Sequence, residues 1–268
     1  MKVSVITINF NNVSGLRMTI ESVVGQSYKD YEYIVIDGNS SDGSKDVLKL
    51  YDQKISYWVS EPDRGIYHAM NKGIAVAKGD YCIFMNSGDY FYDSFVLEHF
   101  IDLGTTDDIV IGKVHDKMTK KIWFAPPQRD ISLYFLYSST IPHQGTFIKT
   151  ELQKKYLYDE TLRIVADWKF FVQAVVLSNC SLKYVDLSVA FFDTKGVSTL
   201  HPLETWNEKC KVLSDFFSPR VISDMRWMKE SECLTLRLAP ILRKYYKIDK
   251  LLYKIGTFFL KIAAKNKK

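Results

Sequence analysis

Short apolar runs alternate with amphipathic helical patterns through the first hundred residues, and this alternation restricts the fold more than any other feature of the chain. The runs are rich in β-branched and aromatic residues and occupy residues 3–9, 33–37, 55–59 and 81–85. Helical spacing follows each of the first three runs, with Ser14 as a candidate cap of the first helix and Gly79 as the end of the third. Strands that alternate with helices form a mostly parallel sheet covered on both faces. The sequence therefore predicts an α/β fold with a Rossmann-like central sheet flanked by helices.

Two carboxylates follow strands of this predicted sheet. Asp37 closes the second run, and Asp89 follows the fourth run after a few small polar residues that include Gly88. Parallel strands end at one edge of a sheet, where open α/β folds bind their ligands, so we expect both carboxylates at one rim. Gly88 removes side-chain bulk and lets a ligand approach the backbone. An ordinary Asx-type turn after each strand is the structural alternative.

The phosphate-binding motifs of other α/β enzymes are missing from the sequence. No glycine-rich loop follows the first strand, and no Gly-Lys-Ser or Gly-Lys-Thr tripeptide occurs. This disfavours a dinucleotide dehydrogenase or an ATPase and leaves a carboxylate that holds a nucleotide diphosphate through a metal. Mg²⁺ and Mn²⁺ suit that role because they combine few carboxylates with phosphate oxygens.

Composition limits the remaining classes. With 268 residues, of which 47% are hydrophobic, the chain can form one large α/β domain or one domain with an appendage. We interpret three features as those of a cytoplasmic protein. The four cysteines are widely spaced, the start lacks a signal-peptide layout, and no apolar stretch is long enough to span a membrane. Residues 237–268 carry a net charge of +9 in a chain of +5, which leaves −4 for residues 1–236. This asymmetry predicts an electrostatic partner for the tail and not general nucleic-acid binding.

Five motifs in a fixed order carry a family resemblance. They are residues 3–9, 35–44, 61–67, 69–73 and 86–89. Together they resemble glycosyltransferase family 2 on the GT-A fold, especially its bacterial polysaccharide-assembly members, over roughly residues 1–200. The resemblance implies an inverting enzyme that moves a sugar from a nucleotide-diphosphate sugar, with a UDP-sugar as the expected donor. The implied acceptor is a hydroxyl of a glycan or lipid-linked oligosaccharide in cell-surface polysaccharide biosynthesis.

The resemblance also implies a donor site. It implies that Thr7 and Asn9 line the nucleotide pocket and that Asp37 binds the base. Asp89 is implied to hold Mn²⁺ or Mg²⁺ as the second carboxylate of the family's Asp-x-Asp motif. Here Ser87 replaces the first carboxylate of that motif and is assigned to the donor site in its place.

Further assignments concern side chains around the implied pocket. The resemblance places Asp63 and Asn71 with the donor, and His143 and Gln144 with the acceptor. For the His-Gln pair, a structural role beside a proline turn is the alternative. His68 stands where close relatives often carry Asp, and a partly exposed helix histidine is the expected role.

Asp167 is the candidate catalytic residue, at the head of an aromatic-rich helix. The resemblance places the family's general base here, and a positioned carboxylate that takes a hydroxyl proton contributes about 10²–10⁴-fold to the rate. With a metal at Asp89 to stabilise the leaving diphosphate, direct displacement with inversion needs no second nucleophilic carboxylate. Capping of the helix that follows is the structural alternative.

The rest of the second half gives weaker signals. Residues 107–114 and 121–125 suggest a hairpin, and residues 182–186 and 189–193 suggest two strands. The aromatic segment 133–137 favours core packing over a platform for a sugar ring. Lys195, Ser198 and His201 lie in a segment that resembles the family's phosphate-proximal loop, with a plain loop as the alternative.

We expect residues 1–205 to form the GT-A domain, with a nucleotide-binding half at 1–100 and an acceptor half at 101–205. Residues 206–268 are predicted to form a helical extension, in which Pro240 begins a basic amphipathic helix. Such a helix can lie on an anionic membrane, here the inner face of the cytoplasmic membrane, where each cation contributes on the order of 1 kcal/mol. A polyprenyl-diphosphate-linked acceptor would explain this docking. Packing on the domain, or on a second copy in an oligomer, is the alternative.

Two other functions stay open on the same fold. A sugar-1-phosphate nucleotidyltransferase needs a basic glycine-rich loop after the first strand, which residues 10–13 do not supply. A non-catalytic membrane-surface protein is favoured by Ser87 and opposed by Asp37, Asp89 and Asp167. The enzymatic hypothesis makes a geometric prediction, which is that these three carboxylates meet around one small cavity.

Overall fold

A computed structural model describes residues 1–126, 131–192 and 200–244, and it describes side chains as far as residue 232. The chain divides into two compact units, Met1–Val212 and Leu213–Lys268, so the first unit extends past the boundary expected at residue 205. Each unit is considered by itself. Lys195 and Ser198 lie outside the described residues, as does most of the predicted basic helix of the tail.

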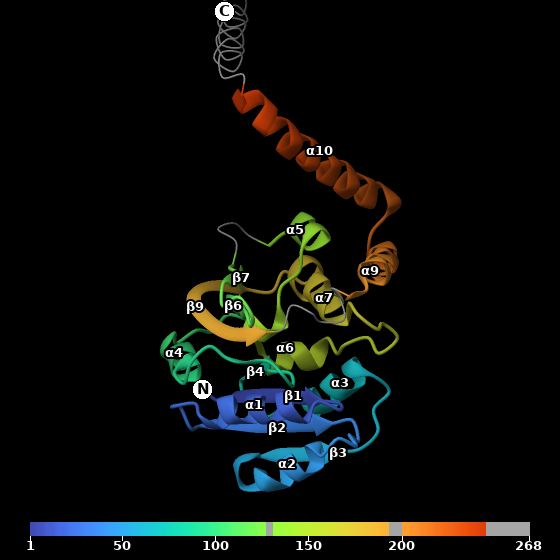
Figure 1. Cartoon of the computed structure of the whole chain (residues 1–268). Helices are drawn as coiled ribbons and strands as arrows, with labels where there is room; N and C mark the ends of the chain where they lie inside the picture. The colour runs from blue at the N-terminus through green and yellow to red at the C-terminus, as the bar shows by residue number, and fades with distance from the viewer. Residues whose placement is uncertain (127–130, 193–199, 245–268) are drawn as a thin grey trace, which may run out of the picture. The chain divides into compact units, whose positions relative to one another are not determined.

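In the described residues, one nine-stranded sheet forms the centre of the first unit (Figure 1). Its order is β3 (Tyr57–Ser60), β2 (Tyr31–Asp37), β1 (Val3–Asn9), β4 (Tyr81–Phe84), β8 (Thr146–Lys149), β6 (Ile109–Asp116), β9 (Leu182–Phe192) and β5 (Tyr90–Phe91), with β7 (Ile122–Phe124) paired to β6. Strands β3, β2, β1 and β4 run parallel to one another. Strand β8 lies between β4 and β6 and is antiparallel to both. The predicted α/β architecture and the β6–β7 hairpin are confirmed, whereas the two strands expected at 182–193 form one continuous strand.

Helices connect and cover the strands of the first unit. They are α1 (Val13–Val24), α2 (Ser44–Leu50), α3 (Ile66–Val76), α4 (Val96–Asp102), α5 (Leu133–Ser138), α6 (Thr150–Lys155), α7 (Ala166–Phe171) and α9 (Pro202–Phe216), with short turns η1 (Asp52–Lys54), η2 (His143–Gly145) and η3 (Val172–Leu177). The expected cap of α1 is wrong, because Asn12 and not Ser14 accepts a hydrogen bond, from the Gly15 N–H at 3.1 Å. Helix α3 ends at Val76, before Gly79, whose backbone packs too closely against Ser4 to leave room for a Cβ.

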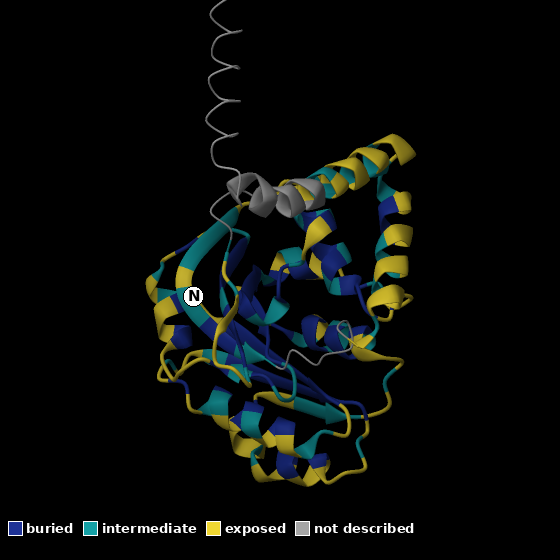
Figure 2. Cartoon of the chain, turned by 45° about the horizontal axis from the view of Figure 1, so that its top comes forward, coloured by how far each residue is buried: buried dark blue, intermediate teal, exposed yellow. Residues whose placement is uncertain are grey.

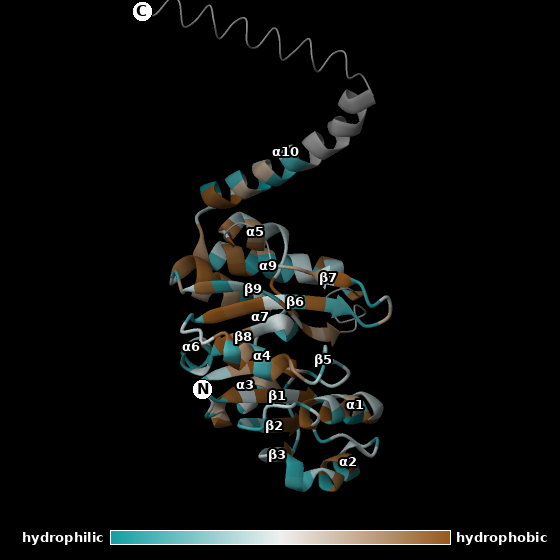
Figure 3. Ribbon diagram, turned by 90° about the vertical axis from the view of Figure 1, so that its left-hand side faces the viewer, coloured by the Kyte–Doolittle hydropathy of each residue, from teal (hydrophilic) through white to brown (hydrophobic). Residues whose placement is uncertain are grey.

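The core lies between the sheet and its helices. Strands β1 and β4 are buried along their whole length, and β2 along all but its first residue, because helices cover both faces (Figure 2). Hydropathy follows the same pattern, since hydrophobic residues run through the sheet while α2 shows one polar side (Figure 3). Leu136 and Tyr137 of α5 are also buried, which confirms the core assignment for these two residues. The polar strand ends thus belong to strands that are buried in the core.

In the second unit, one helix dominates the described residues. Helix α10 runs from Pro219 to Lys244, so the expected helix start at Pro240 is wrong, and this proline lies within a helix that begins 21 residues earlier. The described helices contain no segment that is both long and apolar enough to cross a membrane.

Candidate active site

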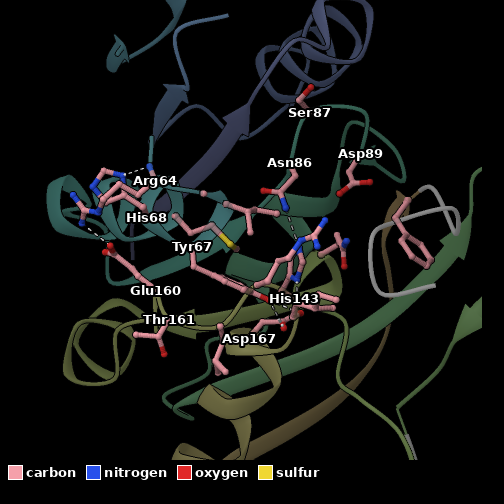
Figure 4. A pocket seen from close by; sticks show the side chains of 18 of the residues that line it. Arg64, Tyr67, His68, Asn86, Ser87, Asp89, His143, Glu160, Thr161 and Asp167 are labelled. Carbon is pink, nitrogen blue, oxygen red and sulfur yellow. Dashed lines mark hydrogen bonds and ion pairs between the residues drawn. The ribbon is translucent and has the colours of Figure 1, made fainter. Parts of the chain in front are cut away.

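A cavity of about 650 Å³ opens at the edge of the sheet in the first unit, a volume within the range of small-molecule sites (Figure 4). Five parts of the chain line it: the start of α3, the loop after β4, the η2 turn, the segment that leads into α7, and the hairpin strand β7 with the end of β9. The predicted site residues among its lining are Ser87, Asp89, His143, Gln144 and Asp167, and His68 also lines it.

The first wall is the loop that follows β4. Gly88 has a φ of +103°, which a residue with a side chain adopts only under strain, and its N–H donates to the Thr19 hydroxyl at 3.0 Å. The Lys117 ammonium donates to the Gly88 carbonyl at 3.3 Å, so a cation lies beside the same loop. Asp89 is 8% exposed and lines the cavity next to Ser87, as the strand-end argument predicts.

Asp167 lies in the first turn of α7, on the opposite wall. Its Oδ1 accepts hydrogen bonds from the Trp168 N–H at 2.9 Å and from the Tyr67 hydroxyl at 3.1 Å. His143 Nδ1 lies 3.2 Å from its Oδ2. The carboxylate is therefore held at both oxygens while the side chain keeps 21% of its surface exposed, on the side of the cavity.

These contacts fix the charge state of the acidic and phenolic groups. Burial by itself would raise the pKa of the Asp167 carboxyl, but the hydrogen bond and charge of His143, with the Trp168 N–H and Tyr67, outweigh it and lower the pKa below the ordinary value. Burial, followed by the charge of Asp167, raises the pKa of Tyr67 far above its usual range. Asp167 is therefore ionised at neutral pH and Tyr67 remains a hydrogen-bond donor.

His143 connects the two walls. Its Nε2 lies 3.1 Å from the Asn86 side-chain amide, which immediately precedes Ser87, and its Nδ1 faces Asp167 (Figure 4). Nδ1–H donates to the carboxylate in this arrangement. Asn86 Oδ1 is buried and has no hydrogen-bond partner among the described residues.

A residue far along the chain positions the start of α7. The Glu208 carboxylate of α9 accepts bonds from three successive backbone N–H groups, those of Arg163 at 2.8 Å, Ile164 at 2.9 Å and Val165 at 3.2 Å. The Tyr67 hydroxyl lies 2.6 Å from the Ile164 carbonyl on the other side, and its single proton is donated either to this carbonyl or to Asp167 Oδ1. The segment before Asp167 is thus fixed between α3 and α9.

The next residue of α9 supports the same helix. The Lys209 ammonium lies 4.8 Å from the centre of the Trp168 ring and donates to the Ser139 carbonyl at 3.2 Å. Burial lowers the pKa of Lys209 to about 8, although the nearby charge of Asp167 opposes this shift. Neither Glu208 nor Lys209 stood out in the sequence, because a helix residue that bonds a distant backbone leaves no local pattern.

The predicted base-binding residues do not line this cavity but are buried in β1 and β2. Asp37 is fully buried, and its oxygens accept bonds from the Asn9 amide at 2.7 Å, the Ser60 hydroxyl at 2.6 Å, and the Ser40 hydroxyl and N–H at 2.6 and 3.0 Å. Thr7 is also fully buried and donates to the Met85 carbonyl. The cavity therefore brings together Asp89 and Asp167 but not Asp37.

The other predicted donor residues also have protein partners. Asp63 lies 2.6 Å from the Lys72 ammonium and 3.1 Å from His68 Nδ1. This Nδ1 can donate to Asp63 or accept from the Arg64 N–H at 3.2 Å, but not both at once. Asn71 bonds the backbone of Tyr158 in both directions, and so it holds the segment that forms the second wall.

Asp89 is the one position predicted to hold a divalent cation. No group of three or more His, Cys, Asp or Glu side chains is arranged as a metal site in the described part of the chain. Asp89, with one carboxylate facing the cavity, still fits Mg²⁺ or Mn²⁺ bound jointly with a diphosphate, since these ions use one or two carboxylates plus phosphate oxygens and water.

Similarity to known proteins identifies the family and supports the fold. The model of the "Glycosyl transferase family 2" sequences matches residues 4–171. An uncharacterised glycosyltransferase of Mycobacterium tuberculosis is 34% identical over 210 residues, which cover 74% of this chain and 77% of the relative. A PGL/p-HBAD biosynthesis glycosyltransferase of Mycobacterium bovis is 26% identical, over 72% of this chain and 77% of the relative. The chain belongs to glycosyltransferase family 2.

Solved structures of low sequence identity share the fold. Staphylococcus aureus TarS, residues 1–349 in complex with UDP, superposes with a TM-score of 0.62 at 18% identity, over 72% of this chain and 61% of that chain. The mannosyltransferase PcManGT of Pyrobaculum calidifontis, in complex with GDP-Man and Mn²⁺, has a TM-score of 0.56 at 13% identity, over 87% of this chain and 80% of that chain. The predicted GT-A fold is confirmed.

Proposed function

We propose that the protein is an inverting, metal-dependent glycosyltransferase. It moves a sugar from a nucleotide-diphosphate sugar, with UDP as the expected nucleotide, to a hydroxyl of a glycan or lipid-linked oligosaccharide. The observation that carries this proposal is one cavity in which Asp89 on the β4 loop and Asp167 beside His143 lie in different environments, while the third carboxylate of its lining, Glu160, pairs with Arg64. Asp89 suits a metal and diphosphate, and Asp167 suits a hydroxyl.

Asp167 acts as the general base in this proposal. The acceptor hydroxyl donates to the carboxylate, which takes the proton as the oxygen attacks the anomeric carbon and the bond to the diphosphate breaks. His143, Tyr67 and the Trp168 N–H hold the carboxylate in place and keep it ionised. Only one base is needed, so the sugar is inverted in a single displacement.

Asp89 holds Mn²⁺ or Mg²⁺ in this proposal, and the bound ion stabilises the charge that develops on the leaving diphosphate. TarS binds UDP and PcManGT binds GDP-Man with Mn²⁺, which supports a nucleotide-sugar donor in this fold. Donor contacts by Thr7, Asn9, Asp37, Asp63, Asn71 and Ser87 stay a prediction.

The cellular setting is also part of the proposal. A role in cell-surface polysaccharide assembly at the inner face of the cytoplasmic membrane would account for a tail with a net charge of +9 from residue 237 to residue 268. A polyprenyl-diphosphate-linked acceptor would then meet the enzyme at that surface.

Thermal unfolding with nucleotides tests the donor half of the proposal. UDP with Mn²⁺ should raise the melting temperature by about 5 °C at saturating concentration, and EDTA should remove most of that rise. Asp89→Ala should abolish the shift, whereas the matched surface variant Asp102→Ala should keep it. A wild-type protein that no nucleotide diphosphate stabilises, with or without Mn²⁺, would refute the proposed function.

A further inference from the structure

One wall of the cavity is aromatic and open. Trp123 of β7 lines the cavity and is 49% exposed, whereas Trp168 of α7 is buried. The Phe192 ring, at the end of β9, also lines the cavity and meets the indole at 4.6 Å between centroids, with an interplanar angle of 61°. The indole thus packs against one neighbouring ring and keeps about half of its surface accessible.

Strand geometry determines which aromatic rings reach the cavity. Strands β7 and β9 flank β6, and successive residues of a strand point to opposite faces. Phe191 stacks on Tyr92, with 5.2 Å between centroids and 19° between planes, and lies close to His115. Its neighbour Phe192 faces the other way, where it meets Trp123. The sheet therefore presents one aromatic pair to the cavity and the other to its opposite face.

This pair lies outside the strands whose ends are expected to bind the nucleotide. Nucleotides in open α/β sheets bind at the carboxyl ends of the parallel strands, which here are β1, β2 and β4. Trp123 belongs instead to the β6–β7 hairpin, which also meets the β4 loop, since Lys117 donates to the Gly88 carbonyl and Phe191 of the neighbouring β9 pairs with Tyr90. A ligand part that touches this indole therefore shares the cavity with both Asp89 and the proposed base, Asp167.

We propose that Trp123 and Phe192 form a platform on which a sugar ring of the acceptor stacks. This inference rests on the proposed function and specifies the acceptor class as a glycan whose ring, and not only its lipid, enters the cavity. The flatter face of a pyranose exposes C–H groups, which pack on the electron-rich face of an indole. Its hydroxyls lie at the ring edge, where the polar side chains of Gln144, Glu160 and Thr161 line the same cavity. A lipid tail would need a continuous apolar groove.

Saturation-transfer NMR on the full-length protein, with UDP and Mn²⁺ present, tests the platform. The probes are the methyl β-D-pyranosides of glucose, galactose, mannose and N-acetylglucosamine. Wild-type protein should transfer saturation to ring C–H protons of at least one probe. Trp123→Ala should weaken the Kd of that probe by about tenfold, and Trp123→Phe should weaken it less. Trp227→Ala, which removes a tryptophan that is 69% exposed on α10, is the matched control and should have no effect.

Calorimetric titration of UDP into the same variants separates this inference from the proposed function. The Kd for UDP should be equal in wild type, Trp123→Ala and Trp227→Ala. A wild-type protein that binds UDP but none of the glycosides, or a Trp123→Ala variant that binds them as wild type does, would overturn the platform alone. A weaker Kd for UDP in Trp123→Ala would assign the indole to the donor and also overturn it. Loss of UDP binding in wild type would instead contradict the proposed function.

Discussion

Two regions of the first unit bury a carboxylate at the end of a structural element, the end of β2 with Asp37 and the start of α7 with Asp167. Around Asp37, the donors are an amide, two hydroxyls and a backbone N–H, and the side chain is fully enclosed. Around Asp167, one partner is the titratable His143 and the side chain opens to a cavity. Burial alone does not distinguish a structural carboxylate from a reactive one, but the type of partner and access to a cavity do.

The largest expected effect is on the rate of transfer and comes from Asp167, the carboxylate that opens to the cavity. Asp167→Asn removes the proposed base with little change in shape, so transfer should fall by at least about 100-fold. Release of UDP from the donor, measured with acceptor present, reports this loss. The exposed Asp186→Asn on β9 is the matched control and should retain activity. Full transfer by Asp167→Asn would assign a structural role to Asp167, like that expected of Asp37.

The enclosed carboxylate should matter most for folding. Asp37→Ala leaves several buried donors without an acceptor, so the free energy of unfolding should fall by about 2–4 kcal/mol. Denaturant titration followed by circular dichroism measures it, with the exposed Asp46→Ala as control. If Asp37→Ala keeps its stability and loses affinity for UDP, the base-binding role implied by the family resemblance holds instead.

A substitution of Glu208 tests how far the position of Asp167 depends on the contacts that α9 makes with the segment before α7. Glu208→Ala frees the three N–H groups before α7, so Asp167 should lose its fixed position and kcat should fall by about 10-fold to 100-fold. The Kd for UDP should stay the same, since the β4 loop is on the other wall. Glu204→Ala, one turn earlier on the same helix, is the control. A loss of UDP affinity equal to the loss of kcat would indicate general misfolding.

The smallest effect should appear in the pH profile. In wild type the pKa of the Asp167 carboxyl is lowered, so kcat/KM should be retained down to acidic pH. His143→Ala removes the hydrogen bond and charge that lower this pKa, and burial then dominates, so the acidic limb should move to higher pH. The matched His99→Ala should not move it. An acidic limb that stays in place in His143→Ala would separate His143 from the base.

The same shift has a consequence for stability. Because the folded-state pKa is lowered, Asp167 stabilises the fold at pH values above the ordinary aspartate pKa of about 3.9. That stabilisation is lost as the pH falls through the folded-state pKa. In His143→Ala burial raises the folded-state pKa, so the ionised carboxylate no longer stabilises the fold and this loss on acidification should disappear, which chemical denaturation across the acidic range can follow.

Much of the first half could be predicted from sequence because its signals are local. Buried β-branched runs, helical spacing and the polar residues after β4 gave the parallel strands and placed Asp89 at their rim. The cap of α1 and the end of α3 were wrong, because Asn12 competes with Ser14 and tertiary packing replaces Gly79 as the terminator. Periodicity fixes the existence of an element more firmly than its ends.

The second half was predicted less completely, because its contacts join distant residues. Asp167 and His143 were known only through a family resemblance, and their pairing depends on two segments 24 residues apart. Glu208 acts on a backbone more than 40 residues away, and Trp123 is distinguished only by its exposure in the folded state. Such roles arise from tertiary structure, so no local pattern could reveal them.

The proposed mechanism depends most on a division of roles between Asp89 and Asp167, which both line the cavity. Calorimetric titration of UDP in the presence of Mn²⁺, on Asp89→Ala and Asp167→Asn side by side, measures that division directly. We predict that Asp167→Asn binds UDP with the wild-type Kd and that Asp89→Ala shows no measurable binding. Equal losses of affinity in both variants, or unchanged affinity in Asp89→Ala, would contradict it.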